Sequence, residues 1–210
     1  MSLFSKLFQF VISTSKKHAI DESHGLTHSM DVLRFAHNIF NSEYMKTPTI
    51  REHERLIYVS AILHDMCDKK YMDEQDGIRE IEAFLEDKME PVEIAVIKKI
   101  ISTMSYSTVK KHGFPELGEY QLAYHIVREA DILAAYDFDR CMVYHMQKIN
   151  QDMEDAFQAA NKLFENRIFR HNEDGLLLTD YSKQQSMVLD NAAMNRIGSW
   201  QAILRTSTFY

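Results

Sequence analysis

Hydrophobic residues recur along most of this chain at the three- and four-residue spacing of an amphipathic helix. The first such stretch covers residues 3–17, where Leu3, Leu7 and Val11 share one face. The same pattern predicts eight further helices, at about residues 26–41, 52–66, 77–87, 91–104, 119–135, 139–149, 153–170 and 183–204. Because neither strand alternation nor an internal repeat or linker is evident, the sequence predicts one all-α domain over residues 1–210.

The breaks between these helices carry turn-forming residues. The three prolines, Pro48, Pro91 and Pro115, stand where the helical pattern is interrupted. Pro91 suits the first turn of a helix, where a missing N–H leaves no hydrogen bond unmade. Residues 105–118 contain Ser, Thr, Gly and Pro, so we expect a loop there, and residues 171–175 predict a turn. Residues 176–179 could form a short extended piece.

Composition and charge narrow the class of protein. Hydrophobic residues make up 45% of the 210 residues and charged residues 26%, which is typical of a soluble globular protein. The formal net charge is -7, and the chain lacks the basic surplus that nucleic-acid binding proteins usually carry. We therefore expect neither nucleic acid nor an acidic membrane surface as a partner.

Cysteine usage and the first residues indicate the compartment. Cys67 and Cys141 form no C-x-x-C pair, which favours a reducing environment and excludes a four-cysteine zinc site. The apolar run at residues 7–12 is too short to cross a bilayer or to act as a secretory signal. These features predict a cytoplasmic protein without a membrane span.

Three short polar stretches interrupt the apolar helical pattern. His28 lies near the start of one predicted helix, the pair His64-Asp65 follows a strongly apolar run, and Asp131 lies within another apolar helix. A carboxylate in such surroundings needs a partner, and a metal ion is one. Two imidazoles and two carboxylates suit a hard-to-borderline divalent ion. The sequence thus predicts one divalent metal ion (Mn, Mg, Co, Ni, Fe or Zn) held by His28, His64, Asp65 and Asp131.

This order of His, then His-Asp, then Asp on separate helices resembles the HD superfamily of metal-dependent phosphohydrolases. The stretch ILHDMCDKKY looks like the HD-x-x-D-x-K-Y motif of one group of small HD phosphohydrolases, and ISTMSYS and KLFENRIF are similar to later parts of that group. The resemblance covers about residues 18–204. It implies an HD-type helical bundle, with the motifs in a core at about 18–140 and further helices at about 150–204. It also implies hydrolysis of a small phosphorylated substrate, foremost a nucleotide.

Residues that follow the His64-Asp65 pair are candidates for a role in catalysis or in substrate binding. Asp68 follows His64 by about one helical turn, so beside Asp65 it could orient the attacking water or carry a proton. Lys69 and Lys70 come next, and one of them could hold a substrate phosphate; the resemblance favours Lys70. An exposed helix end and a solvated lysine pair are the alternatives.

Further substrate contacts are expected from residues spaced along the ligand helices. His24 precedes His28 by four residues, and Arg128 precedes Asp131 by three, so each could reach the site. Weaker candidates are a serine- and tyrosine-containing segment at residues 105–107 and two arginines, Arg140 and Arg196.

A second metal is not expected. HD enzymes with two metals place additional histidines between the doublet and the last Asp, where this chain has His112 and His125. His112 lies in a stretch that is expected to be an exposed loop. His125 lies six residues before Asp131, a spacing that places the two side chains on different faces of a helix.

The chain also departs from the closest group at residues 132–140, which contain no glycine. Because this stretch should lie near the pocket, the substrate of that group cannot be transferred directly.

Several functions stay open at this point. The leading one is a nucleoside triphosphate pyrophosphatase or a monophosphate phosphatase. Hydrolysis of the guanosine alarmone is less well matched, since Cys67 to Lys70 lacks the paired acidic residues expected there. A non-catalytic module that binds metal and nucleotide would show no turnover, and an oxygenase would need more histidine ligands. A homodimer is possible, because Met187, Leu189 and Trp200 could pack on the body or on a second subunit.

Overall fold

The computed structural model describes residues 1–207 of the chain. The chain is 75% helical, and the described part contains no strand, which confirms the all-α prediction. Within that part, no helix combines the length and the apolar character that crossing a membrane requires. Residues 176–179, a possible extended piece, form an irregular segment without strand pairing.

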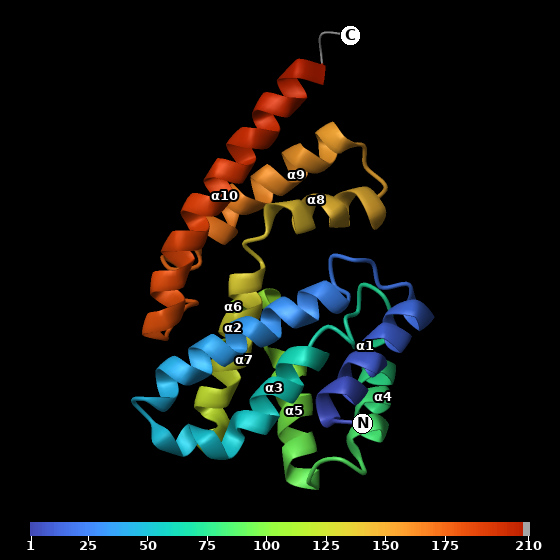
Figure 1. Cartoon of the computed structure of the whole chain (residues 1–210), viewed down its shortest axis with the longest axis vertical. Helices are drawn as coiled ribbons and strands as arrows, with labels where there is room; N and C mark the ends of the chain where they lie inside the picture. Colours follow the sequence, from blue (N-terminus) through green and yellow to red (C-terminus); the bar gives the residue numbers. More distant parts are fainter. Residues whose placement is uncertain (208–210) are drawn as a thin grey trace.

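One group of helices builds the body that carries the predicted ligands (Figure 1). These are α1 (Leu3–His18), α2 (Leu26–Tyr44), α3 (Glu54–Leu63), α4 (Glu74–Leu85), α5 (Pro91–Thr103) and α7 (Gln121–Ala134). Helix α3 lies innermost, since every residue from 56 to 63 is buried. It packs against α2 and α7, which also pack against each other. The short 3-10 turns η1 (Pro48–His53) and η2 (Gly118–Tyr120) lead into α3 and α7.

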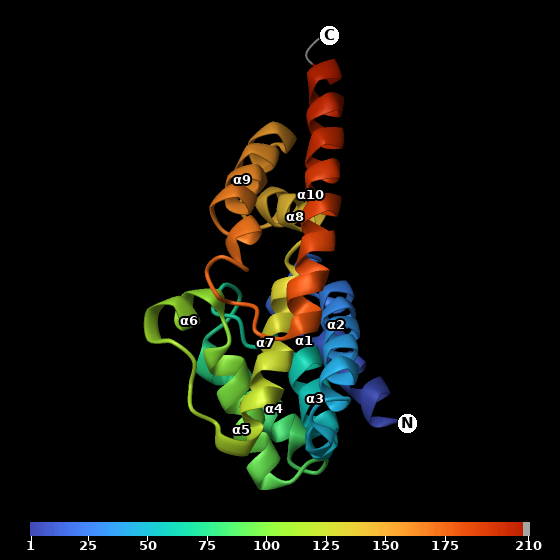
Figure 2. The same cartoon turned by 90° about the vertical axis from the view of Figure 1, so that its left-hand side faces the viewer.

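A second group of helices has its own hydrophobic cluster. It comprises α8 (Phe138–Gln147), α9 (Met153–Asn166) and α10 (Asp180–Ser207). The ring of Phe138 lies 5.6 Å from that of Phe157 and 5.2 Å from that of Phe164, which joins α8 to α9. Figures 1 and 2 show α8 and α9 beyond one end of α7, with the long α10 beside both groups. Leu189 of α10 packs against both clusters and so connects them.

A buried carboxylate ties the start of α10 to α7. Glu129 is fully buried, and its carboxylate accepts hydrogen bonds from the backbone N–H groups of Leu178 and Thr179 at 2.8 and 3.2 Å. The Thr179 hydroxyl donates a third, at 2.7 Å. Because Glu129 lies two residues before Asp131, this anchor fixes the C-terminal helices close to a predicted ligand.

The structure differs from the sequence prediction by one additional helix and at several helix ends, two of which bear on the site. Residues 106–112, expected to be loop, form α6 (Tyr106–His112), because the Ser105 hydroxyl caps it by accepting from the Thr108 N–H at 3.3 Å. Helix α3 ends at Leu63 rather than at 66, and turns follow it. The helix expected over 153–170 ends at Asn166; Arg167, with φ -137°, redirects the chain into η3 (Ile168–Arg170).

The turns after α3 are held against α4. A Cβ added to Gly77 would lie 2.7 Å from the Cα of Cys67, which is closer than such atoms approach in proteins. The missing side chain therefore allows α4 to pack directly on the segment that follows His64. This contact positions the segment that carries Asp65, Asp68 and Lys70.

Candidate metal centre

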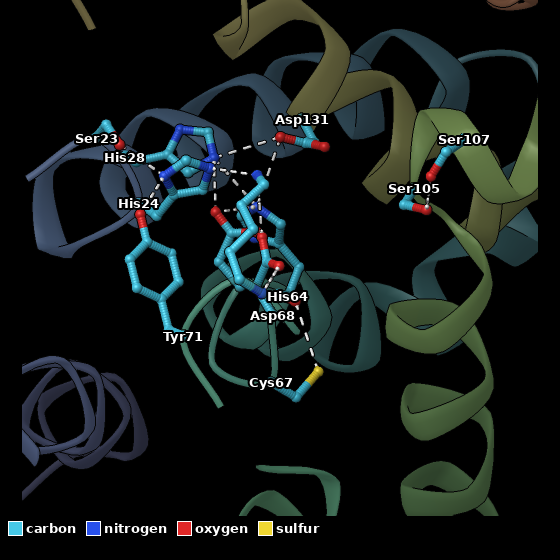
Figure 3. A network of polar contacts seen from close by, with 12 residues as sticks. Ser23, His24, His28, His64, Cys67, Asp68, Tyr71, Ser105, Ser107 and Asp131 are labelled. Atoms are coloured by element: carbon cyan, nitrogen blue, oxygen red, sulfur yellow. Dashed lines mark hydrogen bonds and ion pairs between the residues drawn. The ribbon is translucent and has the colours of Figure 1, made fainter. Parts of the chain in front are cut away.

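Two buried imidazoles from different helices meet at the centre of the site. His28 lies in the first turns of α2, and His64 caps the C-terminal end of α3. Their Nε2 atoms lie 3.1 Å apart (Figure 3). The Nδ1 of His64 lies 2.9 Å from the backbone carbonyl of Ala61, to which it donates. That bond places a proton on Nδ1 and turns Nε2 toward the site, where its lone pair is available once the ring is neutral.

The carboxylates of Asp65 and Asp131 lie close to the same two imidazole nitrogens. The Oδ2 of Asp65 lies 3.3 Å from Nε2 of both His28 and His64. The Oδ1 of Asp131, on α7, lies 3.3 Å from His28 Nε2 and 3.5 Å from His64 Nε2. All four predicted ligands are thus brought together from three separate helices or their ends.

These spacings fit a single coordinated cation. Donor atoms about 2.1 Å from one ion lie about 3.0 Å apart at right angles and about 3.4 Å apart at tetrahedral angles. The distances between the two imidazole nitrogens, and from each nitrogen to the two carboxylate oxygens, are 3.1 to 3.5 Å and so lie close to these values. The donor atoms of His28, His64 and Asp65 lie within 4.8 Å of one another; Asp131 is outside this group of three and approaches only the two imidazoles. Asp65 Oδ2 is also buried without a hydrogen-bond partner, as expected of an atom reserved for a ligand.

In the candidate metal centre, the histidine and aspartate side chains stabilise each other's charged forms. Burial opposes the charged form of His64, but Asp65 and Asp131 outweigh it and raise its pKa well above the ordinary value. Burial also opposes ionisation of Asp65, yet His64 and His28 hold its pKa well below the usual range. The pKa of Asp131 is lowered for the same reason, against the effect of burial. Both carboxylates are therefore ionised at neutral pH and available to a cation.

The centre lies in the wall of a cavity of about 510 Å³ between the two groups of helices. All four predicted ligands line it, and so do Asp68, Lys70 and His24. The opposite wall comes from the end of α5, from α6 and from α8 and α9, and includes Ser105, Tyr106, Ser107, Arg140, Cys141, Tyr144, Leu163 and Arg167. Figure 3 shows Ser105 and Ser107 across from the histidines. The cavity is thus acidic and metal-competent on one side and cationic on the other.

A hydrogen-bonded network holds Lys70 at the edge of this cavity. Its Nζ lies 2.9 Å from His24 Nε2 and 3.2 Å from Asp68 Oδ2. Burial lowers the pKa of His24 to about 4, so its ring is neutral and can accept from Lys70. His24 Nδ1 lies 2.6 Å from the Ser23 hydroxyl and 3.1 Å from the Tyr71 hydroxyl (Figure 3). The cation is thereby fixed in place while 43% of its side chain stays exposed.

Asp68 reaches the cavity by a route other than the predicted one. The expectation was a continuing helix that would place it on the face of His64. Because α3 ends at Leu63, Asp68 is instead carried by turns, and its N–H donates to the Asp65 carbonyl at 3.2 Å. Its Oδ1 accepts the Lys70 backbone N–H at 2.9 Å.

Arg128 does not lie where the sequence placed it. Its side chain is 1% exposed, contacts Glu129 at 3.3 Å and lies over the Phe114 ring at 4.7 Å, and it is not among the residues that line the cavity. The expectation of a substrate contact is therefore corrected: Arg128 lies one turn before Asp131, where it contacts Phe114 and Glu129 instead of the cavity. Arg196, a weaker candidate, pairs with Asp139 on the surface instead.

The remaining histidines lie outside the centre. His112 is exposed at the end of α6, and His125 contacts Gln121 and Phe114. His171 is buried near Tyr106 and Tyr136, and neither of its ring nitrogens has a hydrogen-bond partner in the described structure.

Sequence reasoning missed Arg167 and Tyr144, which both line the cavity. Arg167 lies within KLFENRIF, the stretch similar to a later part of the HD group, but the sequence predicts a continuous helix there and assigns this arginine no role. Tyr144 lies on α8, where its ring contacts His24 at 5.5 Å. The local signal for both was weak, since only the packing of α8 and α9 over the ligand helices brings them to the site.

Comparison with known proteins gives the fold but not the activity. No family model matches the chain, and no curated protein matches it. The crystal structure of a Lactobacillus plantarum protein, solved as a structural genomics target, is similar with a TM-score of 0.71 and 17% sequence identity over 96% of both chains. At that identity the likeness shows a shared all-helical fold across almost the whole chain.

Proposed function

We propose that this protein is a metal-dependent phosphohydrolase of the HD type that acts on a small phosphorylated substrate, foremost a nucleotide. The observation that carries the proposal is the convergence of His28, His64, Asp65 and Asp131 at 3.1 to 3.5 Å in a cavity wall. The order of these residues along the chain, and the segment HDMCDKKY, support the same assignment.

The metal centre would be built by the two imidazole nitrogens and the two carboxylates. When bound, a divalent ion supplies a water of lowered pKa and polarises a phosphoryl oxygen. His64 is already held in the tautomer that leaves Nε2 free, because Nδ1 donates to Ala61. Little rearrangement of the chain would be needed to accept the ion.

Asp68, Lys70 and His24, which line the cavity beside the metal centre, would each have a different role. Asp68 lies in the same cavity, where its carboxylate can accept a proton from the attacking water. Lys70, held between Asp68 and His24, offers a fixed positive charge to a substrate phosphate. Neutral His24 positions Lys70, since its Nε2 can only accept a hydrogen bond when Nδ1 carries the proton.

The test is hydrolysis by metal-stripped protein to which Mn²⁺, Mg²⁺, Co²⁺ or Ni²⁺ is returned singly. A panel of nucleoside mono-, di- and triphosphates is supplied, and phosphate and pyrophosphate release are followed separately. Asp65→Ala is the inactivated variant, and Asp87→Ala, an exposed carboxylate on the surface, is its matched control. Metal-dependent release that only Asp65→Ala abolishes supports the proposal. Metal and nucleotide binding without turnover would overturn it in favour of a binding module.

A further inference from the structure

The C-terminal helices place an arginine in the cavity that holds the candidate metal centre. Arg167 stands at the break between α9 and η3, and it lines the cavity together with Asp131 and Tyr106. Its guanidinium lies over the Tyr106 ring, 3.9 Å from the ring centroid. Because the stack fixes the plane of the guanidinium, the group is already oriented without a bound partner.

This guanidinium has no acceptor on the described part of the protein, whereas Arg140 and Arg128 each have one, although Nε and Nη1 of Arg128 are also buried without a partner. Arg140 donates to the Ser23 carbonyl at 2.8 Å, and Arg128 contacts Glu129. The Arg167 side chain makes no hydrogen bond or ion pair to any residue in 1–207, and its Nε is buried without a partner. A half-buried cation with unused donors is costly unless something in the cavity satisfies it.

The electrostatics indicate the sign of the missing partner. Burial lowers the pKa of Arg167, and Asp131 is the foremost of the charges that oppose this effect. Arg140 and Lys70 line the same cavity and add positive charge. An arginine nevertheless stays protonated, so Arg167 and Arg140 present positive charge to the cavity in addition to Lys70, which lies beside the centre. An anion in the cavity would satisfy Arg167, and with a divalent ion held by the carboxylates it would meet positive charge on both sides; the planar fork of arginine matches two oxygens of a phosphate.

We infer that Arg167 binds the phosphate group of the substrate through two of its non-bridging oxygens, from the wall opposite the metal centre. The α9–η3 break thus supplies a second anion-binding residue, in addition to Lys70 from the segment after α3. The inference rests on the proposed function for the identity of the substrate, but the binding of a phosphate can be measured without turnover.

The experiment is calorimetric titration of inorganic phosphate into the full chain, with and without Mn²⁺. The variants are Arg167→Gln and Arg167→Lys, and Arg170→Gln is the matched control, three residues away with a 55% exposed side chain. A lost charged hydrogen-bond pair predicts phosphate binding weaker by about 10- to 100-fold in Arg167→Gln. Arg167→Lys should fall in between, because it keeps the charge but not the fork. Arg170→Gln should bind like the wild type, and Mn²⁺ affinity should be the same in all variants.

Each result decides one claim. Phosphate binding that is equal in the wild type and Arg167→Gln, or absent from the wild type, would overturn the inference. If Arg167→Gln does not fold, Arg167→Lys decides, and wild-type affinity in that variant would overturn it. Phosphate binding that depends on Arg167 in a protein without hydrolytic activity would support the inference and refute the proposed function. If the protein hydrolyses its substrate but phosphate binding does not depend on Arg167, the proposed function is supported and the inference about Arg167 is refuted.

Discussion

The Nε2 atoms of His28 and His64 lie 3.1 Å apart although 36 residues separate them in the chain. Two neutral imidazoles can share one proton at that distance, but here two carboxylate oxygens also lie within 3.5 Å of both nitrogens. A divalent ion would satisfy all four groups at once.

Metal should stabilise the folded chain. An ion that binds only the native state, at 100 times its Kd, adds about 2.7 kcal/mol to the free energy of unfolding. For a chain of this size that corresponds to a rise in Tm of roughly 5–10 °C. Thermal unfolding with Mn²⁺, compared with the same protein in EDTA, measures the shift. An unchanged Tm in the wild type would speak against a preformed centre.

Asp68 and Lys70 should affect different kinetic parameters. Asp68→Asn removes the proton acceptor, so kcat should fall by about 100-fold or more with metal affinity retained. Lys70→Ala removes a charge that contacts substrate in the ground state as well as in the transition state, so KM should rise about tenfold. Steady-state kinetics separates the two effects, with Lys111→Ala on the exposed face of α6 as a control. Identical effects from Asp68→Asn and Lys111→Ala would remove Asp68 from the mechanism.

Glu129→Ala should destabilise the fold strongly. The substitution leaves three donors of Leu178 and Thr179, two of them buried, and the buried Arg128 without their acceptor. Breaking such a buried charged contact costs about 3–5 kcal/mol. Denaturant unfolding gives the change, and Glu173→Ala, with a 76% exposed side chain, should change stability by less than about 0.5 kcal/mol. A small effect of Glu129→Ala would mean that the start of α10 is not anchored through this carboxylate.

Acid should destabilise the protein in part through His171. Burial lowers the pKa of this imidazole to about 3, whereas in the unfolded chain it is about 6.5. As the pH falls below about 6.5, the unfolded state therefore binds a proton that the folded state refuses, and stability decreases by up to about 1.4 kcal/mol per pH unit until the pH nears 3. His171→Met should flatten the stability profile between pH 6.5 and 4. Urea unfolding at several pH values measures it, with exposed His112→Met as the control; parallel profiles would contradict the prediction.

The sequence predicted those features that depend on local pattern. The helical periodicity gave most elements, and the spacing of His28, His64-Asp65 and Asp131 selected four residues that the structure brings together. Helix ends were harder, because α6 depends on one capping hydroxyl, and the break at Arg167 involves neither glycine nor proline.

Contacts between segments that are far apart in the chain could not be predicted from the sequence. Arg128 shares a helix with Asp131, but its burial depends on Phe114 and on the segment before η2. Arg167 enters the cavity because Tyr106, 61 positions earlier, provides the ring on which it stacks. Neither helical spacing nor motif order contains that information, since both are set by how α6 and α9 pack over the ligand helices.

The most direct measurement is the stoichiometry and affinity of Mn²⁺ binding to metal-stripped wild-type protein and to Asp65→Ala and Asp87→Ala, by calorimetry together with electron paramagnetic resonance of free Mn²⁺. The account predicts one ion per chain in the wild type and Asp87→Ala, and an affinity at least about tenfold lower in Asp65→Ala. A wild-type protein that binds no divalent ion, or an Asp65→Ala variant that binds it as tightly as the wild type, would contradict the assignment of His28, His64, Asp65 and Asp131 as a metal centre.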